Sequence, residues 1–184
     1  FLDKVLNENG TTYSAGTFIN GFDTDNAIFF KTSKFTFVSN TPIITDLRDI
    51  SEFKLVHILS GDTIRIYSVH LKASNTSPDE AQRALEVDTL RKYTNALPIG
   101  SNFIVCGDFN FYRSSESAYQ KLLAVTPGVD GHFIDPITMT GTWNNIAYSS
   151  YHTQSPRVRA FGGGSTGGLN DRFDLVLFSN AMMQ

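Results

Sequence analysis

The segment from Thr63 to Asn110 constrains the fold most, because it is predicted to contain a strand, a helix and a second strand in succession. Residues 63–71 alternate apolar and polar side chains, and residues 102–106 end in a continuous apolar run. Residues 77–97 between them have the pattern of a helix. Such a crossover unit brings the ends of its two strands to one edge of a sheet.

The helix over residues 77–97 carries clear signals at its start and along one face. Ser77 is the expected N-cap, Pro78 lies in the first turn, and Glu80 completes a capping box. The expected apolar face consists of Ala81, Ala84, Leu85, Leu90, Tyr93 and Leu97. The pattern therefore predicts an amphipathic helix that ends before Pro98.

Other strands and helices are predicted on both sides of this unit. Strands are expected at residues 26–31, 35–38, 53–57 and 173–178, and helices at residues 1–9 and 115–125. Strands with interspersed helices favour an α/β or α+β fold. Neither a repeat nor a linker divides the 184 residues, so we expect a single domain with one substantial core.

The composition is that of a globular chain. Hydrophobic residues make up 41% of it, and no apolar run reaches the length of a membrane span. A formal net charge of −3 gives no global attraction to nucleic acid, so contact with a polyanion would depend on local basic clusters. The single Cys106 excludes an internal disulfide and is expected to be a buried core thiol. The compartment stays open, although the low Lys and Arg content slightly favours an exported bacterial protein.

Gly107-Asp108-Phe109-Asn110 follows the second strand of the crossover unit directly. Gly107 allows the backbone to leave the strand conformation. The carboxylate of Asp108 and the carboxamide of Asn110, two residues apart, then point the same way. Such a pair can orient a metal-polarised water and hold a phosphoryl oxygen. The alternative is an ordinary turn at the end of a strand, because Gly, Asp and Asn all favour turns.

Two further residues are candidates for the same site. His70 ends the first strand of the unit and can donate a hydrogen bond to a phosphate, unless it is a structural histidine bonded to backbone. Asp174 lies in an apolar strand, where a carboxylate is costly unless it is paired. It either belongs to the site or forms a structural salt bridge with Arg172 or another arginine.

Three segments, taken in order, resemble the endonuclease/exonuclease/phosphatase superfamily. They are Ser68-Val-His-Leu-Lys72, Gly107-Asp-Phe-Asn110 and Asp171-Arg-Phe-Asp-Leu-Val-Leu177, and the Asn26-Ala-Ile-Phe-Phe segment is similar to a strand common in that superfamily. The resemblance covers nearly the whole chain. It implies a four-layer sandwich of two mixed β-sheets flanked by helices, with Mg²⁺ or Mn²⁺ as cofactor.

The resemblance also implies a role for each candidate residue. Asp108 would orient or deprotonate the attacking water, and Asn110 would hold a phosphate oxygen or a metal-bound water, so both are expected at the metal. His70 would donate to the phosphate as negative charge develops. Asp174 would fix the tautomer of a second histidine.

Four further residues are expected near the substrate. Arg48 would match a phosphate-contacting arginine, although an ion pair with Asp46 or Asp49 is the alternative. The loop before the last strand supplies a basic cluster that would touch phosphate or leaving group, with a solvated loop as the alternative. The residues of this cluster are His152, Arg157 and Arg172, with Arg159 close by.

The chain departs from the superfamily pattern at both ends. The superfamily has a Gln-Glu strand near its start, whose Glu is the principal metal ligand, and a Ser-Asp-His segment near its end. Neither segment is present in these residues. We therefore expect this chain to be the middle of a larger domain, truncated at both ends, with the principal Glu ligand outside it and with impaired metal binding and catalysis.

Two classes of function follow. The first is a Mg²⁺-dependent phosphodiesterase of the nuclease kind, acting on a phosphodiester substrate that could be DNA, RNA, a sphingolipid or an inositol phosphate. The second is a noncatalytic binding or scaffold domain on the same fold. A nucleotide-binding domain is disfavoured, because no glycine fingerprint follows the first strand and the glycine-rich Phe161–Gly168 segment lacks the Gly-Lys-Ser/Thr ending. The oligomeric state is left open.

Overall fold

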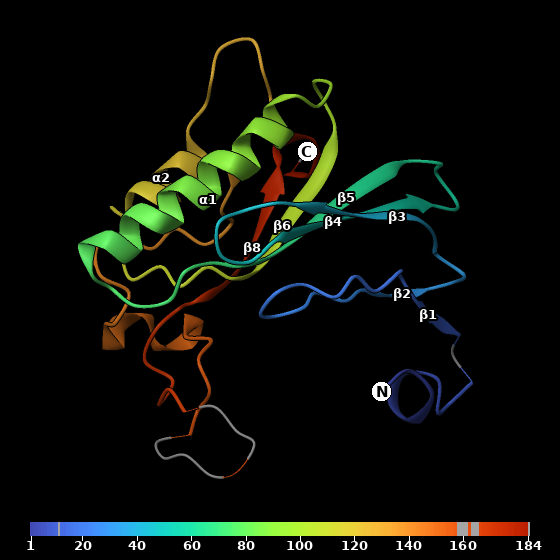
Figure 1. Ribbon diagram of the computed structural model, residues 1–184, viewed down its shortest axis with the longest axis horizontal. Coiled ribbons are helices and arrows are strands. Elements are labelled where there is room, and N and C mark those ends of the chain that lie inside the picture. The colour runs from blue at the N-terminus through green and yellow to red at the C-terminus, as the bar shows by residue number, and fades with distance from the viewer. Residues whose placement is uncertain (11, 158–161, 163–165, 184) are drawn as a thin grey trace.

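The fold is built on one mixed sheet of six strands (Figure 1). The computed structural model describes residues 1–10, 12–157, 162 and 166–183. In spatial order the strands are β3 (Phe35–Ile43), β4 (Ile50–His57), β5 (Thr63–His70), β6 (Asn102–Asp108), β8 (Asp174–Ser179) and β7 (Phe133–Ile134). Among the neighbouring pairs of these strands only β5 and β6 are parallel, and α1 (Ser77–Asn95) joins them, so the predicted crossover unit is present.

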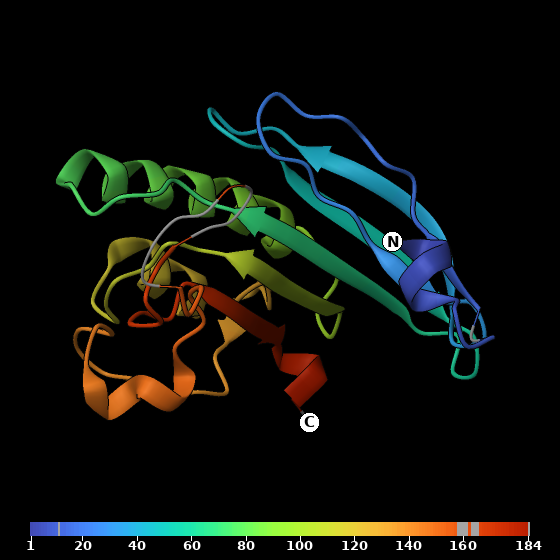
Figure 2. The ribbon, with the colours of Figure 1, turned by 90° about the horizontal axis from the view of Figure 1, so that it is seen from below.

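The layers lie on both sides of this sheet (Figures 1 and 2). Helices α1 and α2 (Ser117–Leu123) cover one face. A two-stranded antiparallel sheet of β1 (Tyr13–Ala15) and β2 (Phe29–Lys31) lies on the other side, and the short helix η1 (Leu2–Leu6) lies beyond it. The predicted α+β class is confirmed, with the second sheet antiparallel in the described residues rather than mixed.

The apolar core lies between the sheet and its helices, and an aromatic contact joins the sheet to β2 on the other side. On the helical side, Tyr67, Val105 and Leu177 of neighbouring strands are fully buried, as expected for central strands covered by helices. On the other side, the ring of Phe30 in β2 stacks 6.0 Å from that of Phe37 in β3. The polar ends of β5, β6 and β8 are therefore fixed by buried segments of the same strands.

The start of α1 differs by one residue from the expectation. The N-cap is Thr76 rather than Ser77, and the capping box is completed by Asp79 rather than Glu80. Thr and Ser can both cap a helix, and Asp and Glu can both complete a capping box. The sequence therefore contains two possible helix starts one residue apart, and its pattern alone does not distinguish them.

The buried face of α1 also differs from the predicted apolar face. Leu85 and Tyr93 are about half exposed, whereas Arg83, Glu86 and Arg91 are buried. Arg83 forms a fully buried ion pair with Glu116 at the start of α2. Arg91 donates to the carbonyls of residues 121, 122 and 124, where α2 ends. Partners on another element thus allow charged side chains to replace apolar ones on the inner face.

Smaller corrections concern other segments. The helix expected over residues 1–9 is a single helical turn, η1, and the helix expected over 115–125 spans Ser117–Leu123. Two further short helices, η2 (Ile146–Tyr151) and η3 (Asn180–Met183), precede and follow β8 in the chain. Cys106 is only partly buried, although burial does raise the pKa of its thiol.

No helix among the described residues has the length and apolarity needed to cross a bilayer.

Candidate active site

Three of the predicted catalytic side chains lie in one row across three neighbouring strands. His70 is the last residue of β5, Asp108 is the last residue of β6, and Asp174 is the first residue of β8. The strand register pairs His70 with Asp108 and Asp108 with Asp174. Since paired residues on neighbouring strands point to the same face, the three side chains form a contiguous group, hereafter the His70–Asp108–Asp174 row.

His70 has a polar neighbour on each side of its ring. Its Nε2 lies 3.8 Å from Oδ2 of Asp108, and the two side chains are 35% and 37% exposed, so solvent and a ligand can reach them. Its Nδ1 lies 3.2 Å from Oγ1 of Thr24, a residue on the segment between β1 and β2. The ring therefore presents one nitrogen to the row and the other to a hydroxyl.

Asp108 lies in an environment that disfavours its charge. Partial burial raises the pKa of this carboxyl above its ordinary range, and the neighbouring charge of Asp174 raises the pKa further. Opposing contributions come from the hydrogen bond of the Asn110 N–H and from the charges of His70 and Arg48. A carboxylate whose pKa is raised in this way accepts a proton more readily than a free aspartate does.

The Gly107–Asn110 turn fixes the shape of the site. Gly107 has a φ of 137°, and a Cβ at this position would lie 2.0 Å from the carbonyl oxygen of Val69 on β5. Asn110 has a left-handed φ of 52°, and its N–H donates to Oδ1 of Asp108 over 3.0 Å. The Asn110 amide nitrogen also donates to the carbonyl of Leu71 over 3.1 Å, which ties the turn to the end of β5.

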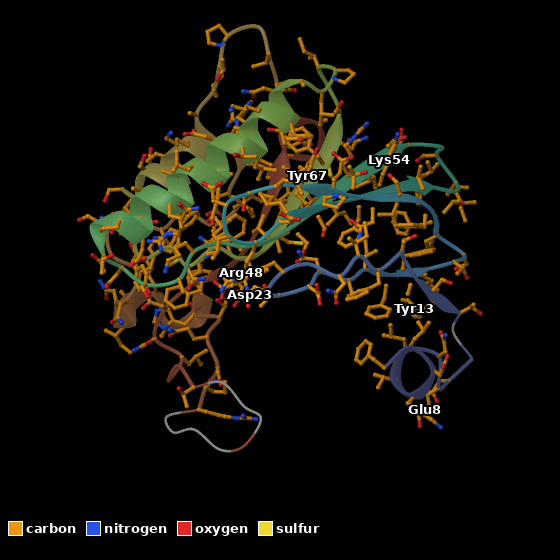
Figure 3. All side chains as sticks on the ribbon, in the orientation of Figure 1. Glu8, Tyr13, Asp23, Arg48, Lys54 and Tyr67 are labelled. Carbon is orange, nitrogen blue, oxygen red and sulfur yellow. The ribbon has the colours of Figure 1, made fainter. Side chains whose placement is uncertain are left out.

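Arg48 is brought to the same end of the sheet. Its Nε donates to Oδ2 of Asp23 at 2.7 Å, and Figure 3 shows the two residues side by side. Its other guanidinium arm lies 3.4 Å from the carbonyl oxygens of both His70 and Leu71. The ion pair expected with Asp46 or Asp49 is therefore formed with Asp23 instead, and the arginine is anchored next to the row.

The expectation that Arg172 contacts substrate is corrected by its surroundings. Its side chain is buried, and both guanidinium amino groups bind the carboxylate of Asp135, at 2.8 and 2.9 Å. Its guanidinium also lies 5.4 Å from the centre of the Trp143 ring, which is fully buried. Arg172 is thus part of the core. The alternative of an Arg172–Asp174 salt bridge is also wrong, since Arg172 pairs with Asp135.

The loop before β8 gives a mixed result. Nε2 of His152 lies 3.0 Å from the carbonyl of Trp143, and Nδ1 lies 3.1 Å from that of Leu169, so both ring nitrogens face backbone. Arg157 accepts backbone hydrogen bonds from two glycines of the Phe161–Gly168 segment. The predicted contacts of His152 and Arg157 with substrate stay predictions. Arg159 lies outside the described residues.

Sequence reasoning missed the contribution of residues 23 and 24. The Asp23–Asn26 stretch has the composition of a turn, and Asp25 accepts a hydrogen bond from the N–H of Gly21. The stretch also supplies Asp23 to Arg48 and Thr24 to His70. The only available signal was position, because these residues directly precede the Asn26-Ala-Ile-Phe-Phe segment that carries the resemblance.

The row partly fits a divalent cation. Among the described residues, no group of three or more His, Cys, Asp and Glu side chains could hold a metal ion. Asp108 and Asp174 nevertheless place two carboxylates side by side, and their mutual repulsion contributes to the raised pKa of Asp108. Mg²⁺ is often bound in proteins through one or two carboxylates, with water and phosphate oxygens as its other ligands.

Comparisons with known proteins agree with this picture at the level of the fold. No family model and no curated protein matches the chain. It does match D. rerio TDP2 in complex with a single-strand DNA product, with 14% identity, 99% of this chain and 68% of that chain covered, and a TM-score of 0.62. It matches the mannosyl-6-phosphatase Bt3783 of Bacteroides thetaiotaomicron with 18% identity, coverages of 97% and 67%, and a TM-score of 0.56.

A third match names the superfamily. It is an endonuclease/exonuclease/phosphatase family protein from Bacteroides thetaiotaomicron, with 18% identity, coverages of 96% and 64%, and a TM-score of 0.54. The chain therefore spans about two thirds of the length of these solved structures. At this level of identity the likeness shows a shared fold, and the predicted resemblance is confirmed to that extent.

Proposed function

We propose that the protein is a phosphoester hydrolase that cleaves a phosphodiester by in-line attack of an activated water. The observation that carries the proposal is the His70–Asp108–Asp174 row, because it gathers a base, a donor and a second carboxylate where β5 and β6 end and β8 begins. Sites in sheets with parallel strands form beyond the carboxyl ends of those strands, which is where β5 and β6 end here.

The chemistry assigned to each residue follows from its surroundings. Asp108 takes the proton of the attacking water, a role that its raised pKa favours. His70, through Nε2, donates to the phosphate oxygen on which negative charge develops, and Arg48 lies close enough to add a positive group. Asp174 keeps the pKa of Asp108 high through its charge.

A divalent cation, Mg²⁺ or Mn²⁺, completes the proposal. It would be held by Asp108 and Asn110, with Asp174 beside them. When bound, such a cation polarises water and neutralises charge on the phosphoryl group. Asn110 is fixed for this role by the hydrogen bond of its side-chain nitrogen to Leu71, which leaves its amide oxygen as the ligand atom.

The substrate class is proposed from the solved structures of the same fold. TDP2 was solved with a single-strand DNA product, which supports a nucleic acid substrate. Bt3783 is a mannosyl-6-phosphatase, so the fold also serves phosphate monoesters. We favour a diester, since Arg48 and His70 offer two donors rather than a cluster suited to a dianion. The net charge of −3 argues for contact with only a short stretch of nucleic acid.

A metal-dependence experiment tests this proposal. The protein is expected to hydrolyse bis-p-nitrophenyl phosphate with Mg²⁺ or Mn²⁺ and to stop when EDTA is added. Asp108→Asn should lower the rate by a factor of about 10²–10⁴, the usual contribution of a general base. Asp62→Asn is the matched control, since Asp62 is an exposed aspartate that directly precedes β5, at the end of the strand away from His70. Full activity in Asp108→Asn would rule out this mechanism.

A noncatalytic binding domain is the second candidate. The observation that favours it is the lack of a three-ligand metal group among the described residues. In that case phosphodiesters would bind near Arg48 and His70 without being cleaved under any metal condition. Binding of dinucleotides, measured by calorimetry, together with no hydrolysis across the metal panel would select this candidate over the hydrolase.

A further inference from the structure

Residues 23–26, before β2, make contacts with the proposed site that could not be predicted from their sequence. Thr24 is exposed, yet its Oγ1 lies 3.2 Å from Nδ1 of His70, although the two residues are 46 positions apart in the chain. No other hydrogen bond to either ring nitrogen of His70 is present among the described residues. The hydroxyl of Thr24 is therefore the one protein group that directly holds Nδ1 in this part of the chain.

The position of Thr24 is fixed by its neighbours. Asp23 is bound to Arg48 at 2.7 Å. Oδ1 of Asn26 accepts a hydrogen bond from the hydroxyl of Ser68 at 2.6 Å, two residues before His70 on the same face of β5. Asp25 closes the segment on itself through the N–H of Gly21. The hydroxyl of Thr24 thus reaches His70 from a segment that is tied to the sheet on both sides.

The surroundings of the ring decide which nitrogen carries the proton. Nε2 lies 3.8 Å from Oδ2 of Asp108, which is beyond hydrogen-bond distance, but the charge of an ionised carboxylate there attracts a proton on the facing nitrogen and so favours the neutral tautomer that is protonated at Nε2. Nδ1 is then an acceptor, and the hydroxyl of Thr24 is the donor to it. Such a bond to one ring nitrogen fixes the tautomer and the orientation of the other.

We propose that Thr24 is a positioning residue for His70: its hydroxyl donates to Nδ1 and keeps the proton on Nε2, the nitrogen that faces the row. The proposal rests on the proposed function for its catalytic meaning, since Nε2–H is the donor assigned to the phosphate. The location of the proton, however, can be measured without any reaction. Thr24 touches neither the row's carboxylates nor, on this proposal, the substrate.

Nitrogen NMR of histidine-labelled protein tests the location of the proton. At a pH where the ring is neutral, His70 of the unaltered protein should show an unprotonated Nδ1 and a protonated Nε2. Thr24→Val and Thr24→Ala should move both resonances toward the average of two exchanging tautomers, whereas Thr24→Ser, which keeps a hydroxyl, should restore them. Thr36→Val is the control, because Thr36 is an exposed threonine on β3. Unchanged signals from His57, His132 and His152 would establish that the variants fold.

Hydrolysis of bis-p-nitrophenyl phosphate separates this proposal from the proposed function. Loss of one neutral hydrogen bond should lower kcat about fivefold in Thr24→Val, with KM little changed and with recovery in Thr24→Ser. Wild-type nitrogen shifts for His70 in Thr24→Val would overturn the positioning role, whatever the activity. No hydrolysis by any variant would overturn the proposed function, while the nitrogen shifts would still establish or refute the role of Thr24.

Discussion

At the scale of single residues, Asp108 combines a proposed catalytic role with a cost to stability. Its carboxyl is partly removed from water and lies beside Asp174, and both effects raise its pKa in the folded protein. Because an unfolded chain lacks this environment, the charged form of Asp108 is better tolerated when the protein is unfolded. The same surroundings that favour proton acceptance therefore weaken the fold at neutral pH.

This linkage predicts how Asp108→Asn changes stability with pH. Between the ordinary and the raised pKa the folded protein binds more protons than the unfolded chain, so the free energy of unfolding falls as pH rises through that window. The penalty is full above the raised pKa and absent below the ordinary one. Asp108→Asn should thus be more stable than the unaltered protein at pH 7 and lose this advantage in acid.

Urea unfolding at neutral and acidic pH measures this difference. Asp62→Asn serves as the control, since Asp62 is exposed in the turn between β4 and β5 and should show no comparable gain at pH 7. A lower stability of Asp108→Asn than of the unaltered protein at pH 7 would contradict the assigned origin of the pKa shift. The same Asp108→Asn sample should hydrolyse substrate more slowly than the unaltered protein, although it is more stable at pH 7.

At the scale of elements, the pairing of β5 with β6 depends on Gly107. A side chain there would meet the backbone of Val69 at 2.0 Å, in the residue pair directly before His70 and Asp108. Gly107→Ala should therefore cost more than about 3 kcal/mol, since it adds a backbone clash to the strain of an unfavourable φ. Gly61→Ala is the matched variant, because Gly61 also has a positive φ but nothing lies near its missing Cβ.

Unfolding in urea distinguishes the two glycine variants. Gly61→Ala should lose only about 1 kcal/mol, the cost of a left-handed conformation in an open turn. Gly107→Ala should in addition broaden or shift the NMR signals of His70, because the end of β5 must move. Equal losses in the two variants would mean that the close approach to Val69 does not constrain the site.

Most elements could be predicted from the sequence, because their signals are local. The alternation of β5, the apolar run of β6 and the start of α1, predicted to within one residue, each depend on residues within a few positions of one another. The inner face of α1 could not be predicted in the same way. Arg83 is accommodated by Glu116 and Arg91 by the carbonyls at the end of α2, partners 30 or more positions away.

At the scale of the whole molecule, the convergence of the row could be anticipated but its supports could not. The crossover rule places the ends of β5 and β6 side by side, and the resemblance added Asp174. Nothing in the local sequence relates Thr24 to His70 or Asp23 to Arg48, since these contacts depend on how the segment before β2 lies on the sheet. The wrong assignment of Arg172 has the same cause: its partner, Asp135, lies 37 positions away.

The central claim is that His70 and Asp108 act together in one hydrolytic site. It is tested most directly by the rates at which His70→Ala, Asp108→Asn and the double variant hydrolyse bis-p-nitrophenyl phosphate with Mg²⁺. Residues that act as a unit are not additive, so each single variant should lose a factor of about 10² or more and the double variant little beyond the larger single loss. Losses that multiply, or full activity in either single variant, would contradict the account.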